Sequence, residues 1–223
     1  MTRRKYFDYG FMALGLLIQV VTYWISYQLS ADSSQLSVVS LICGCLGVCS
    51  VCLTAQGKMA MYVFGFSQVL LYLYISWKQH LYGQVAINAF YFASMIYGVF
   101  AWRNRLQADS QTVATRRLPR VWAIVLLVAT ILVSGLTGWG LSAWTNDQQP
   151  YLDAFTTIPA LVAQVLMILV FCEHWYIWLA VDVLSVVMWI YVGDYCLAAQ
   201  YVFWCANCLY GLYRWRSLGI SKV

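Results

Sequence analysis

The chain has 223 residues, of which 63% are apolar and only 9% are charged. Soluble domains carry roughly 25% charged residues, and a chain this poor in polar side chains cannot cover a core of its own. The composition therefore excludes a soluble globular protein. The net charge of +5 gives no support for nucleic-acid binding, because the basic residues follow a membrane topology.

Eight apolar runs of about 20 residues are each long enough to cross a bilayer. Lipid offers the backbone no hydrogen-bond partners, so runs of this length must be helical. The sequence predicts an all-α integral membrane protein with eight transmembrane helices. In chain order the predicted spans are 9–29, 36–54, 58–77, 81–102, 121–141, 151–171, 174–192 and 196–215.

Lysine and arginine residues predict the orientation of these spans. Eight spans place both termini on one side, and if that side is the cytoplasm, twelve of the thirteen basic residues lie inside. This is the distribution that the positive-inside rule requires. Lys78 alone falls outside, whereas a seven-span arrangement would move Arg214, Arg216 and Lys222 to the wrong side.

The fourth and eighth spans end in similar sequences. Residues 97–103 read YGVFAWR and residues 210–216 read YGLYRWR, with four of seven positions identical. We call the separation along the chain between Tyr97 and Tyr210 the repeat offset. Two further spans precede each copy, which predicts one helix, three helices, one linker helix and three helices. Because one linker helix separates them, the triplets cross in the same direction, as parallel repeats do. The alternative is a common helix ending with aromatic and basic anchors.

The repeat predicts how the chain is divided. Two triplets that face each other enclose a cavity at their junction, where transporters of this kind bind substrate. The predicted parts are 1–35 with the extra helix, 36–103 as the first repeat, 104–145 as a cytoplasmic loop and linker helix, 146–216 as the second repeat, and 217–223 as a cytoplasmic tail.

The seventh span carries one polar and aromatic stripe. Trp175, Trp178, Asp182, Ser185 and Trp189 are spaced 3, 4, 3 and 4 residues apart, so they share a helix face. Two indoles and a carboxylate on successive turns suit a flat, cationic ring, since tryptophan gives the strongest cation–π contact. The alternative is that the tryptophans anchor the helix at the interface and Asp182 bonds a neighbouring helix.

Amide and hydroxyl side chains form stripes on four other spans. Amides both donate and accept hydrogen bonds, which suits a carboxamide or sugar hydroxyls, although a single amide more often connects two helices. The candidate substrate contacts on these spans are Gln68, Gln84, Asn88, Thr157, Gln164, Gln200 and Asn207.

The sequence contains no P-loop motif and no paired nucleophile and base, so we predict no catalytic residue, no cofactor and no enzyme activity. Two histidines, His80 and His174, are too few for a histidine-rich metal site. The four cysteines between residues 43 and 52 are better explained as small, polarizable core residues than as metal ligands.

Several of these segments resemble the PnuC family of bacterial vitamin transporters over roughly residues 36–216. The segments are AQGK at 55–58, LYGQ at 81–84, YLDAFTT at 151–157, Ala163-Gln164 and, most specifically, W-x-x-W-x-x-x-D at 175–182. Many members of this family have asparagine where this chain has Asp182.

The resemblance implies import of nicotinamide riboside across the bacterial inner membrane by facilitated diffusion, with a cytoplasmic riboside kinase that traps the substrate. It also implies a SWEET-like core, an added N-terminal helix and a homotrimer. Transport of thiamine or riboflavin, proton coupling through Asp153 or Asp182, and a non-transporting receptor remain alternatives. Because no basic residue lies in the middle of a span, we expect the phosphorylated mononucleotide to bind poorly.

Overall fold

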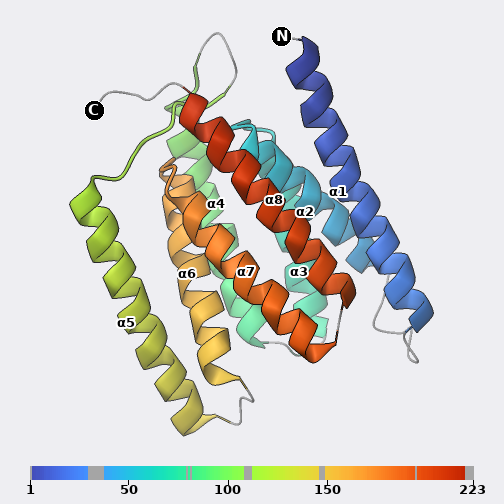
Figure 1. The fold of residues 1–223 in the computed structure, drawn as a ribbon, viewed down its shortest axis with the longest axis vertical. Coiled ribbons are helices and arrows are strands. Elements are labelled where there is room, and N and C mark those ends of the chain that lie inside the picture. The colour runs from blue at the N-terminus through green and yellow to red at the C-terminus, as the bar shows by residue number, and fades with distance from the viewer. Residues whose placement is uncertain are drawn as a thin grey trace. The chain divides into compact units, whose positions relative to one another are not determined.

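The computed structural model describes residues 2–29, 38–78, 80, 82–107, 112–145, 149–193 and 195–218, so Lys222 and most of the predicted tail lie outside the described residues. Eight α-helices account for most of this part of the chain, as the apolar runs predict (Figure 1). They are α1 (Thr2–Leu29), α2 (Val38–Ala55), α3 (Met61–Lys78), α4 (Tyr82–Arg103), α5 (Arg120–Trp144), α6 (Pro150–Ile168), α7 (His174–Val192) and α8 (Tyr195–Ser217).

Six of these helices are long and apolar enough to cross a membrane, namely α1, α2, α4, α5, α6 and α7. The other two, α3 and α8, have similar lengths, but amide, tyrosine and tryptophan side chains interrupt their apolar runs. Such side chains lower the hydropathy of a helix without preventing it from crossing, provided that they face a protein neighbour or a cavity.

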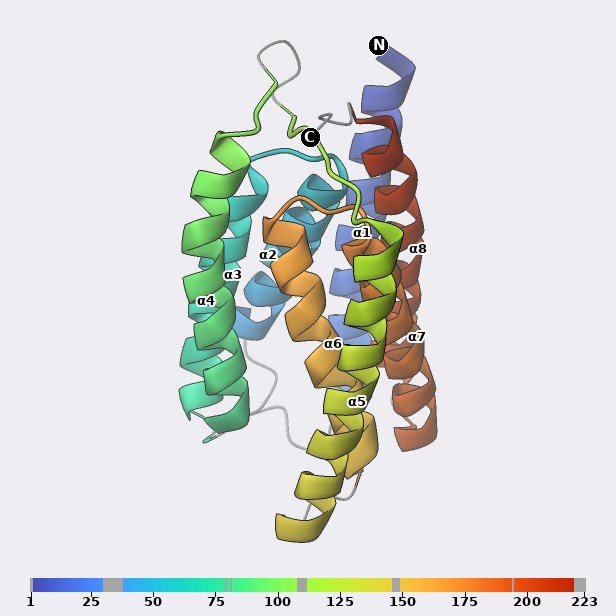
Figure 2. The ribbon, with the colours of Figure 1, turned by 90° about the vertical axis from the view of Figure 1, so that its left-hand side faces the viewer.

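The chain divides into two compact units, residues 1–114 and 115–223. Within unit 1, α1 packs on α2, α2 on α3, and α3 on α4; within unit 2, α5 packs on α6, α6 on α7, and α7 on α8. Figure 2 shows two of these neighbouring pairs, α3 with α4 and α5 with α6. The boundary falls inside the loop that the sequence predicts between residues 104 and 120, so each unit holds one extra helix and one triplet.

The turn between the second and third helices of unit 1 recurs in unit 2, one repeat offset later. Gly57 has a φ of 69° and Val170 has a φ of 65°, so both adopt the left-handed conformation. In each turn the residue after the left-handed one donates its backbone amide to the carbonyl of the residue five positions before itself. The N···O distance is 3.1 Å in unit 1 and 2.9 Å in unit 2. The third helix of each unit then starts four residues after the left-handed residue, at Met61 and His174.

An edge-to-face pair of aromatic rings recurs at the same repeat offset. Tyr62 meets Trp102 with ring centroids 5.4 Å apart and planes at 85°, and Trp175 meets Trp215 at 5.8 Å and 84°. Both Trp102 and Trp215 are fully buried. The similarity that the sequence shows at the ends of α4 and α8 therefore extends to the packing of these ends on α3 and α7.

The segment between α4 and α5 holds each turn by backbone hydrogen bonds. In unit 1, the amide of Val113 donates to the carbonyl of Gly57 at 3.0 Å. In unit 2, the amide of Arg116 donates to the carbonyl of Val170 at 2.8 Å, and the amide of Cys172 donates to the carbonyl of Arg116 at 2.9 Å. These contacts satisfy the polar groups that the end of a helix leaves free.

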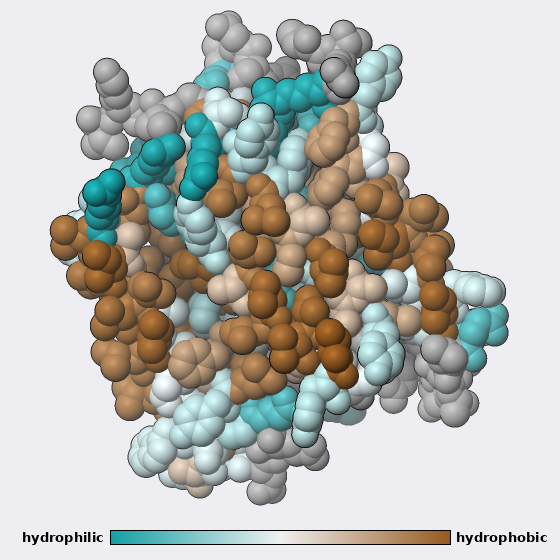
Figure 3. All heavy atoms as spheres, in the orientation of Figure 1, coloured by the Kyte–Doolittle hydropathy of each residue, from teal (hydrophilic) through white to brown (hydrophobic). Residues whose placement is uncertain are grey.

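Helix α5 has a largely apolar outer surface. Figure 3 shows apolar side chains along most of its length, with more hydrophilic ones near both of its ends. Bulky side chains such as Trp122, Leu132 and Leu136 are more than half exposed. A surface of this kind is stable against lipid and not against water, because hydrocarbon chains do not penalise it.

We predict that Gly211→Ala destabilises the fold. A Cβ at this position would lie 2.5–2.6 Å from three ring carbons of Trp175, and the buried ring has no room to retreat. Overpacking of this size costs about 1–3 kcal/mol, which corresponds to a fall in melting temperature of about 2–4 °C per kcal/mol. Thermal unfolding in detergent measures the effect.

The matched control is Gly135→Ala in α5, where a Cβ would meet no atom within 4 Å. This variant should melt at or above the temperature of the unmodified protein, because alanine favours a helix over glycine. Equal melting temperatures for the two variants would contradict the predicted packing around Trp175.

Candidate functional site

The ten candidate residues from the sequence divide between the units. Seven lie in unit 2, on the adjacent helices α6, α7 and α8, and three lie in unit 1, on α3 and α4. The structure therefore brings together the elements that carry the larger group. Unit 2 carries Thr157, Gln164, Trp175, Trp178, Asp182, Gln200 and Asn207, and unit 1 carries Gln68, Gln84 and Asn88.

The centre of the group in unit 2 is a buried carboxylate. Asp182 of α7 is 7% exposed, and the thiol of Cys208 on α8 donates a hydrogen bond to its Oδ2 at 3.3 Å. We call Asp182 and Cys208 the polar pair. A carboxylate inside a membrane protein is costly and usually marks a functional site. Sequence reasoning identified Asp182 but missed Cys208, which directly follows the candidate Asn207.

The two tryptophans of the predicted motif have different surroundings. Trp175 is 3% exposed, and its ring lies against His174 at 4.4 Å, Trp215 at 5.8 Å and the backbone of Gly211. Trp178, one turn further along α7, is half-buried. Trp175 is therefore part of an aromatic cluster at the start of α7, whereas Trp178 is the indole that lies nearer to Asp182.

The aromatic cluster is completed by backbone contacts. Nδ1 of His174 lies 2.6 Å from the carbonyl oxygen of Phe171, and Cys172 donates its S–H to the carbonyl of Trp215 at 3.8 Å. Burial raises the pKa of the Cys172 thiol, so this cysteine is a neutral packing group at physiological pH. The hydroxyl of Thr115 also donates to the carbonyl of Trp215, at 3.0 Å.

Unit 1 shows what the fold places at the equivalent positions. At the repeat offset, Trp178 corresponds to Gly65, and the polar pair corresponds to Val69 and Met95. Val69 and Met95 are 6% and 5% exposed, and the methyl carbon of Met95 lies against Gly65. The same helix pair thus packs with apolar contacts in unit 1, so the fold itself does not require a tryptophan or a polar pair there.

The amides of unit 2 are buried to different degrees. Gln164 is 6% exposed and Asn207 is 2% exposed, while Gln200 and Thr157 are half-buried. An amide at this depth needs hydrogen-bond partners from protein or ligand.

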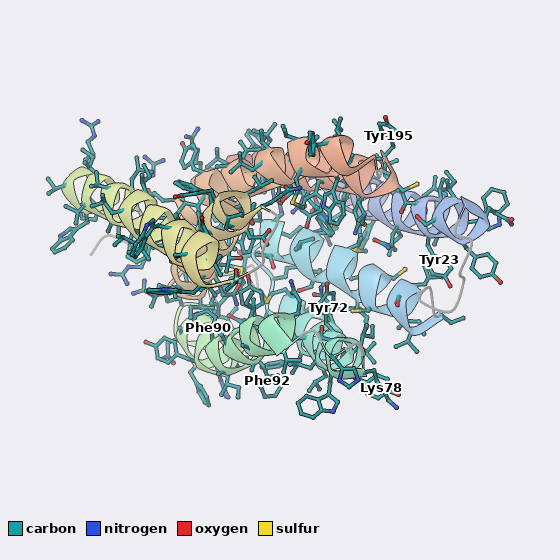
Figure 4. All side chains as sticks on the ribbon, turned by 90° about the horizontal axis from the view of Figure 1, so that it is seen from below. Tyr23, Tyr72, Lys78, Phe90, Phe92 and Tyr195 are labelled. Carbon is teal, nitrogen blue, oxygen red and sulfur yellow. The ribbon has the colours of Figure 1, made fainter. Side chains whose placement is uncertain are left out.

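The amides of unit 1 show contacts between helices and within a helix. The side chain of Gln68 lies over Gly47 of α2, whose Cβ would be 2.9 Å from Nε2 of Gln68. Asn88 is buried and donates to the backbone carbonyl of Gln84 at 2.8 Å, while the Gln84 side chain is exposed. Lys78 lies at the edge of unit 1, at the end of α3 (Figure 4), over the ring of Tyr74.

Among the residues that the structure describes, no group of three or more histidine, cysteine, aspartate or glutamate side chains is placed to hold a metal ion. All eight cysteines are free. In unit 2, the site therefore consists of an indole, a carboxylate with its thiol donor, and amides.

Such a polar site within apolar helices is typical of a polytopic membrane protein that carries a small polar molecule. Comparison with known proteins identifies the class more closely. The chain belongs to the nicotinamide mononucleotide transporter family, whose model matches residues 37–217. The family is one of transporters, not enzymes, and the resemblance to PnuC is confirmed by the relatives that follow.

Two relatives are both named nicotinamide riboside transporter PnuC. The protein from Haemophilus influenzae is 28% identical over 217 residues, covering 96% of this chain and 91% of that protein. The protein from Neisseria mucosa is 29% identical over 220 residues, covering 93% and 81%. A crystal structure of the vitamin B3 transporter PnuC is similar with a TM-score of 0.74 and 26% identity, covering 95% of this chain and 91% of that one.

We predict that the two tryptophans differ in their effect on stability. Trp175→Ala empties the core of the aromatic cluster, and a change of this kind costs about 3–5 kcal/mol. Trp178→Ala should cost less, because the indole is half-buried and unit 1 has glycine at the equivalent position. Thermal unfolding of both variants without ligand measures the difference, and equal losses would contradict the separate surroundings described above.

Proposed function

We propose that this protein imports nicotinamide riboside across the bacterial inner membrane by facilitated diffusion. The observation that carries the proposal is the buried Asp182, one turn from Trp178 and bonded to Cys208, in a chain whose relatives are named nicotinamide riboside transporters. The absence of these side chains from the equivalent positions of unit 1 supports a role in binding rather than in folding.

The chemistry of the substrate matches these side chains. Nicotinamide riboside has a pyridinium cation, a carboxamide and a ribose. An indole face attracts a flat cation, and the Asp182 carboxylate complements its charge or accepts from the ribose. Gln164, Gln200 and Asn207 supply donors and acceptors for the carboxamide and hydroxyls. We assign Trp175 a supporting place at the base of the site, because its ring is enclosed by the aromatic cluster.

Features of unit 1 that recur in unit 2 support a transporter built from two repeats. Recurrence of the left-handed turn and of the aromatic pair at the repeat offset supports two parallel three-helix repeats with a SWEET-like core. In transporters of this kind, the repeats move against each other around a site near the membrane midplane. We propose that Gln68, Gln84 and Asn88 of unit 1, and Thr157 of α6, also contact the substrate during transport.

We place both termini in the cytoplasm, because that orientation keeps twelve of the thirteen basic residues inside. A homotrimer and a cytoplasmic riboside kinase, which would trap the substrate by phosphorylation, complete the proposal.

Trp178→Ala should weaken binding of nicotinamide riboside by about 1–3 kcal/mol, by analogy with the stacking of bases on aromatic side chains. Calorimetry on protein purified in detergent measures the affinity. The matched control is Trp139→Ala on α5, whose indole is 57% exposed and should leave the affinity unchanged. If Trp178→Ala binds as tightly as the unmodified protein, this indole is not part of the site.

The mononucleotide should bind at least about tenfold more weakly than the riboside, because its phosphate adds negative charge near Asp182 without a basic partner. Every lysine and arginine in the eight described helices lies in a first or last turn. The family is described as a mononucleotide transporter and the two relatives as riboside transporters, so calorimetry with both ligands separates these readings. Equal affinities would refute the expectation.

Thiamine is the second candidate substrate, because it is also a flat cation and suits the same indole and carboxylate. A calorimetric panel of nicotinamide riboside, thiamine and riboflavin distinguishes the substrates. Uptake into liposomes with and without a pH gradient distinguishes facilitated diffusion from proton coupling, and binding without any uptake would identify a receptor.

A further inference from the structure

We infer that Cys208 is a positioning residue for the substrate site: its thiol orients the Asp182 carboxylate toward a cationic ligand. The inference rests on the proposed function and adds a residue to the site on α7. Cys208 differs from the proposed contacts because it acts through Asp182.

The geometry defines how Cys208 acts. Its Sγ donates to Oδ2 of Asp182 at 3.3 Å, and the side chains are 4% and 7% exposed. The terminal torsion of an aspartate is broad when nothing holds it. A thiol has a single hydrogen to donate, so it fixes one carboxylate oxygen, and the plane of the group with it. Oδ1 is then the oxygen left to face a ligand.

The thiol of Cys208 is a weak hydrogen-bond donor, which suits a carboxylate that must also attract a cation. An S–H group is a poorer donor than a hydroxyl or an amide, so it withdraws little negative charge from the carboxylate. A strong donor would also hold the group, but it would compete with a cation for the same charge. Cysteine therefore fixes the direction of Asp182 and leaves most of its charge available to the ligand.

Unit 1 shows whether the fold needs the polar pair, because it has the same helices without that pair. Val69 and Met95 occupy the positions of the polar pair in unit 1, and both are buried. At these two positions the third and fourth helices of unit 1 therefore carry apolar side chains in place of a hydrogen-bonded pair. Because burying a carboxylate without need is costly, the polar pair of unit 2 is best explained by what it does for a ligand.

The test uses the full chain with Cys208→Ala and Cys208→Ser, measured by calorimetry with nicotinamide riboside and with its reduced, uncharged dihydro form. Cys208→Ala should weaken binding of the cation about two- to tenfold, the loss expected for one hydrogen bond. Cys208→Ser keeps a donor and should recover most of the affinity. A remaining loss of up to about twofold is expected, because the hydroxyl is the stronger donor and competes with the cation. Binding of the uncharged form should change less than twofold in either variant.

The control is Cys196→Ala, also on α8 but about 18 Å of helix away from Cys208, which should bind like the unmodified protein. Unchanged affinity of Cys208→Ala for the cation would overturn the inference. Equal losses for the charged and uncharged forms would also overturn it, because a structural defect affects both. If Cys208→Ala does not fold, Cys208→Val, which has no hydrogen to donate and leaves a smaller cavity than alanine, replaces it.

The proposed function fails separately, if the unmodified protein does not bind nicotinamide riboside. The same variants are then measured with thiamine, which is also a cation. Loss with Cys208→Ala and recovery with Cys208→Ser would uphold the positioning role for that ligand, whereas unchanged affinity would overturn it. In Asp182→Asn, the further change Cys208→Ala should add less than twofold, since residues that act as a pair are not additive.

Discussion

The hydrocarbon core of a membrane supplies no hydrogen-bond partners, and most features of this protein follow from that. Its eight helices bond their own backbones, and bulky apolar side chains face outward on α5. Where helices end, the segment between α4 and α5 satisfies the carbonyls of Gly57 and Val170. In such surroundings a buried carboxylate is an exception that needs a reason, and Asp182 is bonded to a neighbouring thiol.

The two units share one arrangement of helices but carry different side chains at the equivalent positions. In unit 1 the methyl carbon of Met95 on the fourth helix lies against Gly65 on the third, and Val69 is a buried apolar residue one turn away. At the equivalent positions unit 2 has an indole and the polar pair, while the edge-to-face aromatic pair at the helix ends has the same geometry in both units. The scaffold is thus repeated and the chemistry is not, which allows a binding site to arise without loss of packing.

Sequence periodicity predicted the helices and the repeat offset because both depend on spacing along one chain. It placed Asp182 on a helix face, but it did not find Cys208, because that contact depends on the rotation of α8 against α7. Likewise, Trp175 and Trp178 share a stripe, but only packing against Trp215 separates their surroundings. The predicted end of the sixth span at residue 171 exceeds α6, which ends at Ile168 before a left-handed residue.

That left-handed residue is Val170, where unit 1 has glycine. Glycine accepts this conformation freely, whereas a β-branched side chain does so at a cost of about 1–3 kcal/mol. The turn before α7 therefore holds a strained backbone conformation, and the amide of Arg116 stabilises it by a hydrogen bond to the carbonyl of Val170 at 2.8 Å. Because α7 begins at His174, four residues after Val170, a change in the segment that holds this turn would act on the helix of Trp178 and Asp182 without touching the substrate.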